Sequence, residues 1–423
     1  MRFISPVALV LAMALTSGAV STPAMAQKKQ QSKAPKLNVS ADVIKALQAA
    51  QQAMQKQDFA AAKASIAQAE GLAKSNDDRY QTAAIKLNLS IETKDSALQG
   101  EALSVMLDSG LTPADQVGQF SAAAAEQALA AKNYDLAISR AQAAIQANFR
   151  PEAVNVTLAQ AYFGKAGTGN GSVEPARGFN VQGLAALKAA ATAMKAAGQQ
   201  VPAQWYQIGV SRSEVAKLPE ITDWARMAFE ADPSGQNLRT LIRLFQRANP
   251  SISNRENLDV LRLMSISGGL VLAGDFTEYA EMASKTGIYG EVKTAIDAGR
   301  AKGVLSGAQG GDLYQQAVAR IAGDKATLGA AEADARKAAN GKIAAATADA
   351  YLGYGDYAKA ASLFEVARQK GGVDADEINT RMGIALTKSN DLAGAKAAFS
   401  AVQNGARKQI AGLWLSYLST KGV

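Results

Sequence analysis

The side chains that most often carry out chemistry in proteins are missing from this sequence. Its 423 residues include no cysteine and no histidine. Their absence excludes disulfides, thiolate metal sites and Ser-His-Asp triads, and it argues against zinc, haem and copper centres. What remains is carboxylate chemistry, a Ser-Lys pair, or oxygen-ligated Mg²⁺ or Ca²⁺. The acids, such as Glu126, Glu230 and Glu365, fall on ordinary helix positions. We therefore expect no catalytic, cofactor-binding or metal-binding residues and a protein that is not an enzyme.

A glycine-rich stretch at residues 164–183 is the segment that most invites a nucleotide-binding interpretation. A phosphate-binding P-loop needs a glycine five residues before Gly-Lys-Ser/Thr. Here Gly164-Lys165 has Ala159 in that place and Ala166 after it. The dinucleotide-binding pattern fails at its last glycine, and no strand-helix-strand pattern surrounds the stretch. The sequence predicts an inter-helix loop.

Three arginines follow one another at four-residue spacing. Arg239, Arg243 and Arg247 share one face of a predicted helix, where like charges repel by roughly 0.2–0.5 kcal/mol per pair. Neighbouring acids or an anionic ligand must offset that repulsion, so a solvated face and an anion-binding ridge both stay open. The net charge of +8 and the pI near 9.4 fit an anionic partner such as a polysaccharide. Many envelope proteins are mildly basic without such a partner.

Residues 1–26 have the pattern of a secretory signal peptide. A short basic start is followed by an apolar stretch and then by Ala24-Met25-Ala26, whose small residues suit signal peptidase. Cleavage would leave a flexible basic tail over residues 27–38. No other apolar run is long enough to span a bilayer. The sequence thus predicts a periplasmic or secreted protein with no transmembrane anchor after cleavage, and export argues against a nucleic-acid partner.

A short pattern recurs along this alanine-rich chain: a polar residue with a bulky neighbour, an alanine three residues on, and a further apolar residue four positions later. These positions lie on one face of an α-helix, where alanine lets a second helix approach closely. Each copy follows another helical stretch, so the sequence predicts repeating helical hairpins of about 34 residues. The copies begin at Asp58-Phe59, Asp95, Asn133-Tyr134, Asp275-Phe276, Asp356-Tyr357 and Asp391-Leu392.

The pattern resembles the tetratricopeptide repeat (TPR) family. The likeness is best in the two C-terminal copies, which are 35 residues apart. Ala348, Ala360 and Ala367 in one copy, and Gly383 and Ala395 in the other, stand where the family has small residues. The family's first-helix tryptophan and closing proline are missing. The resemblance implies an all-α fold, a TPR-like right-handed α-solenoid of helical hairpins.

The middle of the chain resembles exported bacterial TPR-like proteins of unassigned activity, through the segments at Trp205-Tyr206 and Trp224-Ala225-Arg226. That resemblance implies fold and compartment only. The predicted organisation is TPR-like helical hairpins at residues 39–163, the glycine-rich loop at 164–183, a degenerate helical-repeat middle at 184–330 and C-terminal TPR-like repeats at 331–423.

The TPR resemblance also implies a long concave face lined by the first helix of each hairpin. Transferred by register, and joined by the arginine ridge, the predicted partner-binding residues are Gln119, Glu126, Arg239, Arg243, Arg247, Lys342, Asp349, Glu377 and Thr380. We expect a non-catalytic helical-repeat scaffold that binds a protein or peptide. The first alternative is a binder of anionic polysaccharide or cell wall in envelope assembly or export. The second is a solenoid-bearing peptidoglycan lyase.

Overall fold

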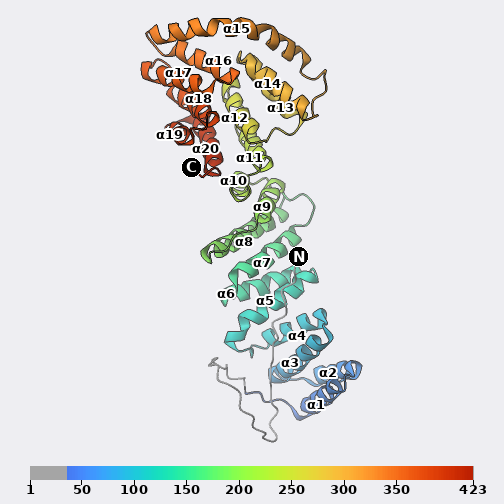
Figure 1. Cartoon of the computed structure of the whole chain (residues 1–423). Coiled ribbons are helices and arrows are strands. Elements are labelled where there is room, and N and C mark those ends of the chain that lie inside the picture. The colour runs from blue at the N-terminus through green and yellow to red at the C-terminus, as the bar shows by residue number, and fades with distance from the viewer. Residues whose placement is uncertain (1–35, 423) are drawn as a thin grey trace.

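A computed structural model describes residues 36–422, and within that range the regular structure is entirely helical (Figure 1). Twenty helices follow one another in these residues, and consecutive helices pack side by side. The predicted all-α architecture of repeating helix pairs is confirmed. The predicted signal peptide (residues 1–26) and most of the predicted tail (residues 27–38) lie outside the described residues. No helix in the described part of the chain is long and apolar enough to cross a membrane.

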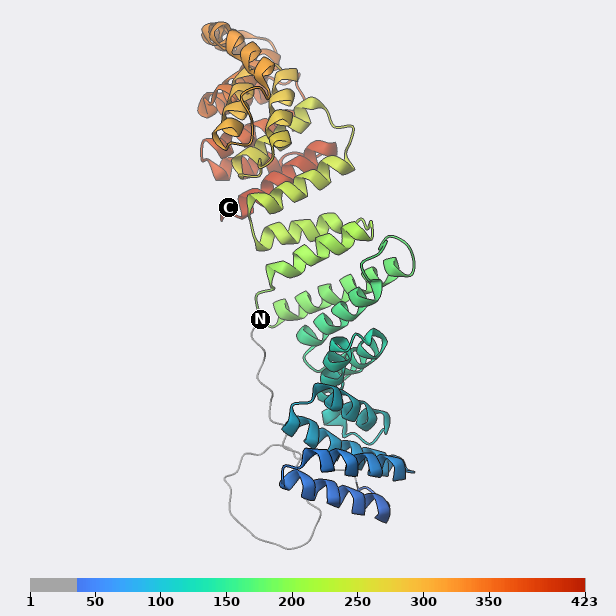
Figure 2. The ribbon, with the colours of Figure 1, turned by 90° about the vertical axis from the view of Figure 1, so that its right-hand side faces the viewer.

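The first ten helices form an elongated stack, here named the open arm (Figures 1 and 2). Each odd-numbered helix is the first of a pair, and the next is its second. The arm contains α1 (Ala41–Gln55), α2 (Phe59–Leu72), α3 (Asn76–Thr93), α4 (Ser96–Asp108), α5 (Ala114–Ala130), α6 (Tyr134–Gln146), α7 (Pro151–Ala166), α8 (Ala176–Ala196), α9 (Ala203–Val215) and α10 (Ile221–Ala231).

The polar residue of the recurring pattern works as a helix N-cap. Asp58, Asp95 and Asn133 each accept a hydrogen bond from the backbone N–H three residues later, at 3.0, 3.1 and 3.3 Å. Such a bond satisfies one of the free donors at a helix start. Asp356 and Asp391 do the same further along the chain. The pattern therefore marks helix starts because its first residue supplies the capping oxygen.

The copy at Asp275 differs from the other five, and the prediction that a helix begins there is wrong by two residues. The helix α13 begins at Ala273, so Asp275 is its third residue. Its carboxylate reaches back to accept hydrogen bonds from the N–H groups of Val271 and Leu272, at 2.9 and 2.8 Å. The carboxylate still serves the helix start, but from inside the first turn.

The glycine-rich loop is shorter than predicted. The helix α7 continues to Ala166 and α8 begins at Ala176, so only residues 167–175 connect them. Gly183 lies inside α8 because the Phe163 ring packs directly against it. A Cβ there would lie 2.4 Å from that ring. Burial against α7 thus outweighs the low helix propensity of glycine.

The last helices form a compact part, here named the closed module (residues 254–419). It contains α12 (Asn254–Ile266), α13 (Ala273–Lys285), α14 (Tyr289–Ala301), α15 (Gly311–Lys337), α16 (Lys342–Tyr354), α17 (Tyr357–Lys370), α18 (Ala375–Lys388), α19 (Leu392–Ser400) and α20 (Gly405–Ser419). The helix α11 (Gly235–Ala248) connects it to the arm. The even-numbered helices make an inner layer in which α20 and α18 return to contact α12.

Buried charges close this inner layer. Asp259 on α12 is fully buried and accepts hydrogen bonds from Arg262 and from Arg407 on α20, each at 2.7 Å. The indole N–H of Trp414 donates to the backbone oxygen of Asp259 at 3.2 Å. One continuous hydrophobic core runs from α10 and α11 through the module, whereas the rest of the arm has a series of smaller clusters. The module is therefore closed on itself, and the arm is held by neighbour-to-neighbour packing.

Candidate functional site

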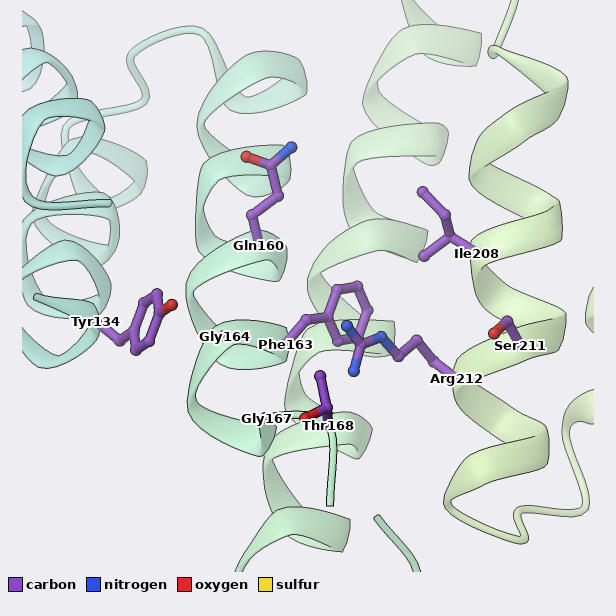
Figure 3. Close-up of a pocket in the computed structure, with 9 residues that line it drawn as sticks. All are labelled: Tyr134, Gln160, Phe163, Gly164, Gly167, Thr168, Ile208, Ser211 and Arg212. Atoms are coloured by element: carbon purple, nitrogen blue, oxygen red, sulfur yellow. The ribbon is translucent and has the colours of Figure 1, made fainter. Parts of the chain in front are cut away.

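An open hollow of about 620 Å³ lies between α7 and α9 in the middle of the arm (Figure 3). Gln160 and Phe163 of α7 line one side, and Ile208 and Arg212 of α9 line the other. Tyr134, the first residue of α6, borders it next to α7. We call the surface formed by the first helices α5, α7 and α9 the first-helix face. The repeat register predicts partner-binding residues on this face only in α5, at Gln119 and Glu126.

Two glycines allow the aromatic walls of the hollow. A Cβ at Gly164 would lie 2.3 Å from the Tyr134 ring, and one at Gly183 would lie 2.4 Å from the Phe163 ring. Atoms do not approach so closely, so only glycine permits these contacts. The Tyr134 ring therefore lies against α7 and the Phe163 ring against α8. Because neither ring is pushed outward, the space between α7 and α9 stays open.

Arg212 is the charged group of the hollow. Its guanidinium lies over the Phe163 ring, 4.7 Å from the ring centre, and one nitrogen lies 3.5 Å from the side-chain oxygen of Asn180. Burial lowers the pKa of Arg212, and among the described residues no carboxylate pairs with it. The hydroxyls of Ser211 and Thr168 line the same hollow. The site therefore offers a desolvated cation, aromatic surface and hydroxyl groups.

The two predicted residues on α5 lie on the first-helix face. Gln119 is half-buried and Glu126 is exposed. Gln160 takes on α7 the place that Glu126 has on α5, one repeat of about 34 residues earlier. Partial desolvation raises the pKa of Glu126, and the charge of Arg150 opposes that rise. Both predicted residues are available to a partner, and Glu126 belongs to the helix next to the hollow.

The predicted residues of the closed module differ in exposure: Lys342 is exposed and Glu377 is half-buried, whereas Asp349 and Thr380 are buried. Lys342, Asp349 and Glu377 line a smaller hollow of about 240 Å³, together with Arg255. The Asp349 carboxylate accepts from Arg381 at 2.9 Å, and Glu377 forms ion pairs with Arg255 and Arg381 at 2.9 and 2.6 Å. Burial raises the pKa of Asp349 above its usual value, although Arg381 partly opposes this. The structure therefore brings Lys342, Asp349 and Glu377 together at one hollow, and the two acids are paired with arginines of the same chain.

Among the predicted partner-binding residues, Thr380 is the least accessible to another molecule. Its side chain is completely buried, and its hydroxyl donates to the backbone oxygen of Asp376 at 2.6 Å. The assignment of Thr380 and of buried Asp349 as surface contacts has to be corrected. The repeat register assigns both residues to the inner face of their helices. In the structure that face is covered, because α18 and α20 return to contact α12.

The arginine ridge is neutralised from within the molecule. Arg239 and Arg243 both bind the buried carboxylate of Asp275, with shortest distances of 2.9 and 2.6 Å. Arg243 also pairs with Glu278, and Arg247 pairs with Glu214 at 2.7 Å. Neighbouring acids therefore offset the repulsion between these arginines, and the ridge joins α11 to α9 and α13.

The sequence reasoning missed Arg212 and the pocket role of Phe163 and Tyr134. Phe163 lies one repeat length after Leu129, a position that the register marks as facing the groove. Extending the register across the glycine-rich stretch would have found it. Arg212 carries no such signal, because its partner ring belongs to a helix 49 residues earlier. Within residues 36–422 no group of three acids is arranged to hold a metal ion.

No protein-family model matches this chain, and no curated protein matches its sequence.

Proposed function

We propose that the chain is a non-catalytic helical-repeat scaffold, a TPR-like right-handed solenoid, that binds an extended segment of another protein along the first-helix face of its open arm. After loss of the predicted signal peptide it would act in the periplasm or outside the cell. The observation that carries this proposal is the open hollow at α7 and α9, set against the inner face of the closed module, where Asp349 and Asp259 are buried and paired with arginines of the same chain.

The composition of the hollow favours a polypeptide. Tyr134, Phe163 and Ile208 supply apolar and aromatic surface, and Gln160 and Ser211 supply side-chain hydrogen-bonding groups. Sites for peptides and small ligands combine mostly apolar walls with a few placed polar groups. The polysaccharide alternative draws no support from the arginine ridge, because its arginines are paired with Asp275, Glu278 and Glu214.

A photo-crosslinking amino acid at Gln160 tests the proposal. In an envelope extract we expect it to form a covalent adduct with a defined polypeptide, because Gln160 is exposed beside the hollow. The matched control carries the same group at Lys188, which is exposed on the second helix α8. The adduct at position 160 should disappear in a Ser211→Trp variant, whose indole would fill the hollow.

Equal crosslinking at positions 160 and 188 would contradict a specific first-helix face. Adducts of carbohydrate and not of protein at position 160 would instead support the polysaccharide alternative.

A further inference from the structure

Two charges of opposite sign on the first-helix face lack ion-pair partners in the described part of the chain. Arg212 on α9 is partly desolvated and has one long contact, to Asn180. Glu126 on α5 feels the charge of Arg150 but does not form an ion pair with it. Elsewhere the molecule pairs its buried arginines closely, as Arg262 and Arg381 show. A charge that loses water without gaining a partner, as that of Arg212 does, is unfavourable.

The surroundings of Arg212 define what would pair with it. The guanidinium carbon lies 4.7 Å from the centre of the Phe163 ring, and the only hydrogen-bond partner of the planar guanidinium edge among the described residues is Asn180, at 3.5 Å. A carboxylate accepts two parallel N–H groups from such a planar edge. Tyr134 and Ile208 lie on either side of this position and offer apolar surface (Figure 3). A carboxylate with an apolar neighbour matches the guanidinium edge of Arg212 and the apolar surfaces of Tyr134 and Ile208.

The position of Glu126 adds a second requirement. Glu126 lies on α5, and α7 separates it from α9. The helix α5 packs against α7, and α7 faces α9 across the hollow. Two helix spacings of about 10 Å give a separation on the order of 20 Å between Glu126 and Arg212. An extended chain covers that distance in about six residues. One short segment can therefore reach both charges.

We propose that the first-helix face binds an extended polypeptide segment that places a carboxylate, next to an apolar side chain, against Arg212 and a basic side chain, about six residues away, against Glu126. The inference rests on the proposed function and specifies the charge pattern of the partner.

Synthetic peptides test this charge pattern on the mature chain. One peptide carries Leu-Glu and Lys with a Gly-Ser spacer that sets them about six residues apart, and it is made in both chain directions. Arg212→Glu should weaken binding of the better peptide about tenfold or more, because a charged hydrogen-bonded pair is lost. A second peptide with Lys in place of Glu should recover the affinity for Arg212→Glu. Glu126→Lys should behave in the same way toward a peptide with Glu in place of Lys.

The control variant is Arg226→Gln, which removes an exposed arginine of α10 and should leave the affinity unchanged. Circular dichroism checks that every variant remains folded. Unchanged binding in Arg212→Glu, or no binding of either peptide direction, would overturn the charge pattern. Competition by a mixture of free glutamate and free lysine would show a small-molecule site in place of a segment-binding one. If the Gln160 adduct persists while these tests fail, the scaffold proposal stands and the charge pattern falls.

Discussion

Asp275 holds most of the arginine ridge in place. Its side chain is only 1% exposed, and it accepts hydrogen bonds from Arg239, Arg243 and two backbone N–H groups. Burial alone would raise the pKa of Asp275, but these donors hold it well below its ordinary value of 3.8. A folded-state pKa below the unfolded one means that the ionised carboxylate stabilises the fold. Its contribution is complete above about pH 4 and is lost as the pH falls through the folded-state pKa.

We expect Asp275→Asn to lower the free energy of unfolding by about 3 kcal/mol at neutral pH, because two partly buried arginines lose their carboxylate. The difference from the unchanged protein should shrink as the pH falls below about 4. Urea unfolding at pH 6 and pH 3 measures both effects.

The control for this prediction is Glu278→Gln. Both Glu278 and its partner Arg243 are more than a quarter exposed, so the effect should stay below about 1 kcal/mol. A loss in Asp275→Asn that does not change with pH would contradict the assignment of the effect to ionisation.

At the scale of the helix, close packing in the arm depends on glycines beneath aromatic rings. Gly164 lies beneath Tyr134, Gly183 beneath Phe163, and Gly209 beneath Trp224. A Cβ at Gly209 would lie only 2.2 Å from the indole. The gain in packing offsets the low helix propensity of these glycines. Because Arg212 lies over Phe163, the contact at Gly183 also positions the candidate site.

We expect Gly183→Ala to destabilise the protein by about 1–3 kcal/mol, because the added methyl group must displace the Phe163 ring. Gly323 in α15 is a matched control, since it is exposed and a Cβ there meets no atom within 4 Å. Gly323→Ala should stabilise by up to about 1 kcal/mol through helix propensity alone. Urea midpoints of the two variants should therefore move in opposite directions, and a shift in the same direction would refute the packing argument.

At the scale of the whole molecule, the open arm and the closed module differ in what covers the surface of their first helices, which are the odd-numbered helices in the arm and the even-numbered helices in the closed module. In the closed module that surface holds Asp259, which Arg381 and Arg407 approach from α18 and α20. Burial opposes ionisation of Asp259, yet Arg381, Arg407 and Arg262 lower its pKa overall. In the arm no distant helix returns to cover the first-helix face between α7 and α9 (Figure 2). The first-helix face between α7 and α9 therefore stays open, whereas Asp259 in the closed module is covered.

We expect Asp259→Asn to destabilise the closed module by about 3–5 kcal/mol, because buried arginines would lose their shared countercharge. Hydrogen exchange should show early loss of protection in α20, whose Arg407 depends on Asp259. Asp297→Asn is the control: it removes the exposed pair with Lys293, which is worth little. Unchanged protection of α20 in Asp259→Asn would show that apolar packing around Trp414 closes the module without the ion network.

The sequence by itself determined that the chain is built of paired helices, and it located several helix starts and the alanine faces on which those helices pair. Asp58, Asn133 and Asp356 cap helices through bonds that span three residues, and Ala62 and Ala137 are buried as predicted. The register also placed Glu126 on a first helix, and the structure leaves its side chain exposed. Local patterns succeed here because helix starts and helix faces depend on residues within one or two turns.

Only the tertiary structure decided which first-helix residues remain available. Asp259 meets Arg407 across 148 residues, and whether they meet depends on the summed rotation of every helix pair between them. A small change at each repeat would separate α12 from α20 and open the inner face. A short sequence pattern does not encode the summed rotation of many helix pairs. The sequence therefore could not show that Asp349 and Thr380 are buried while the hollow beside Arg212 stays open.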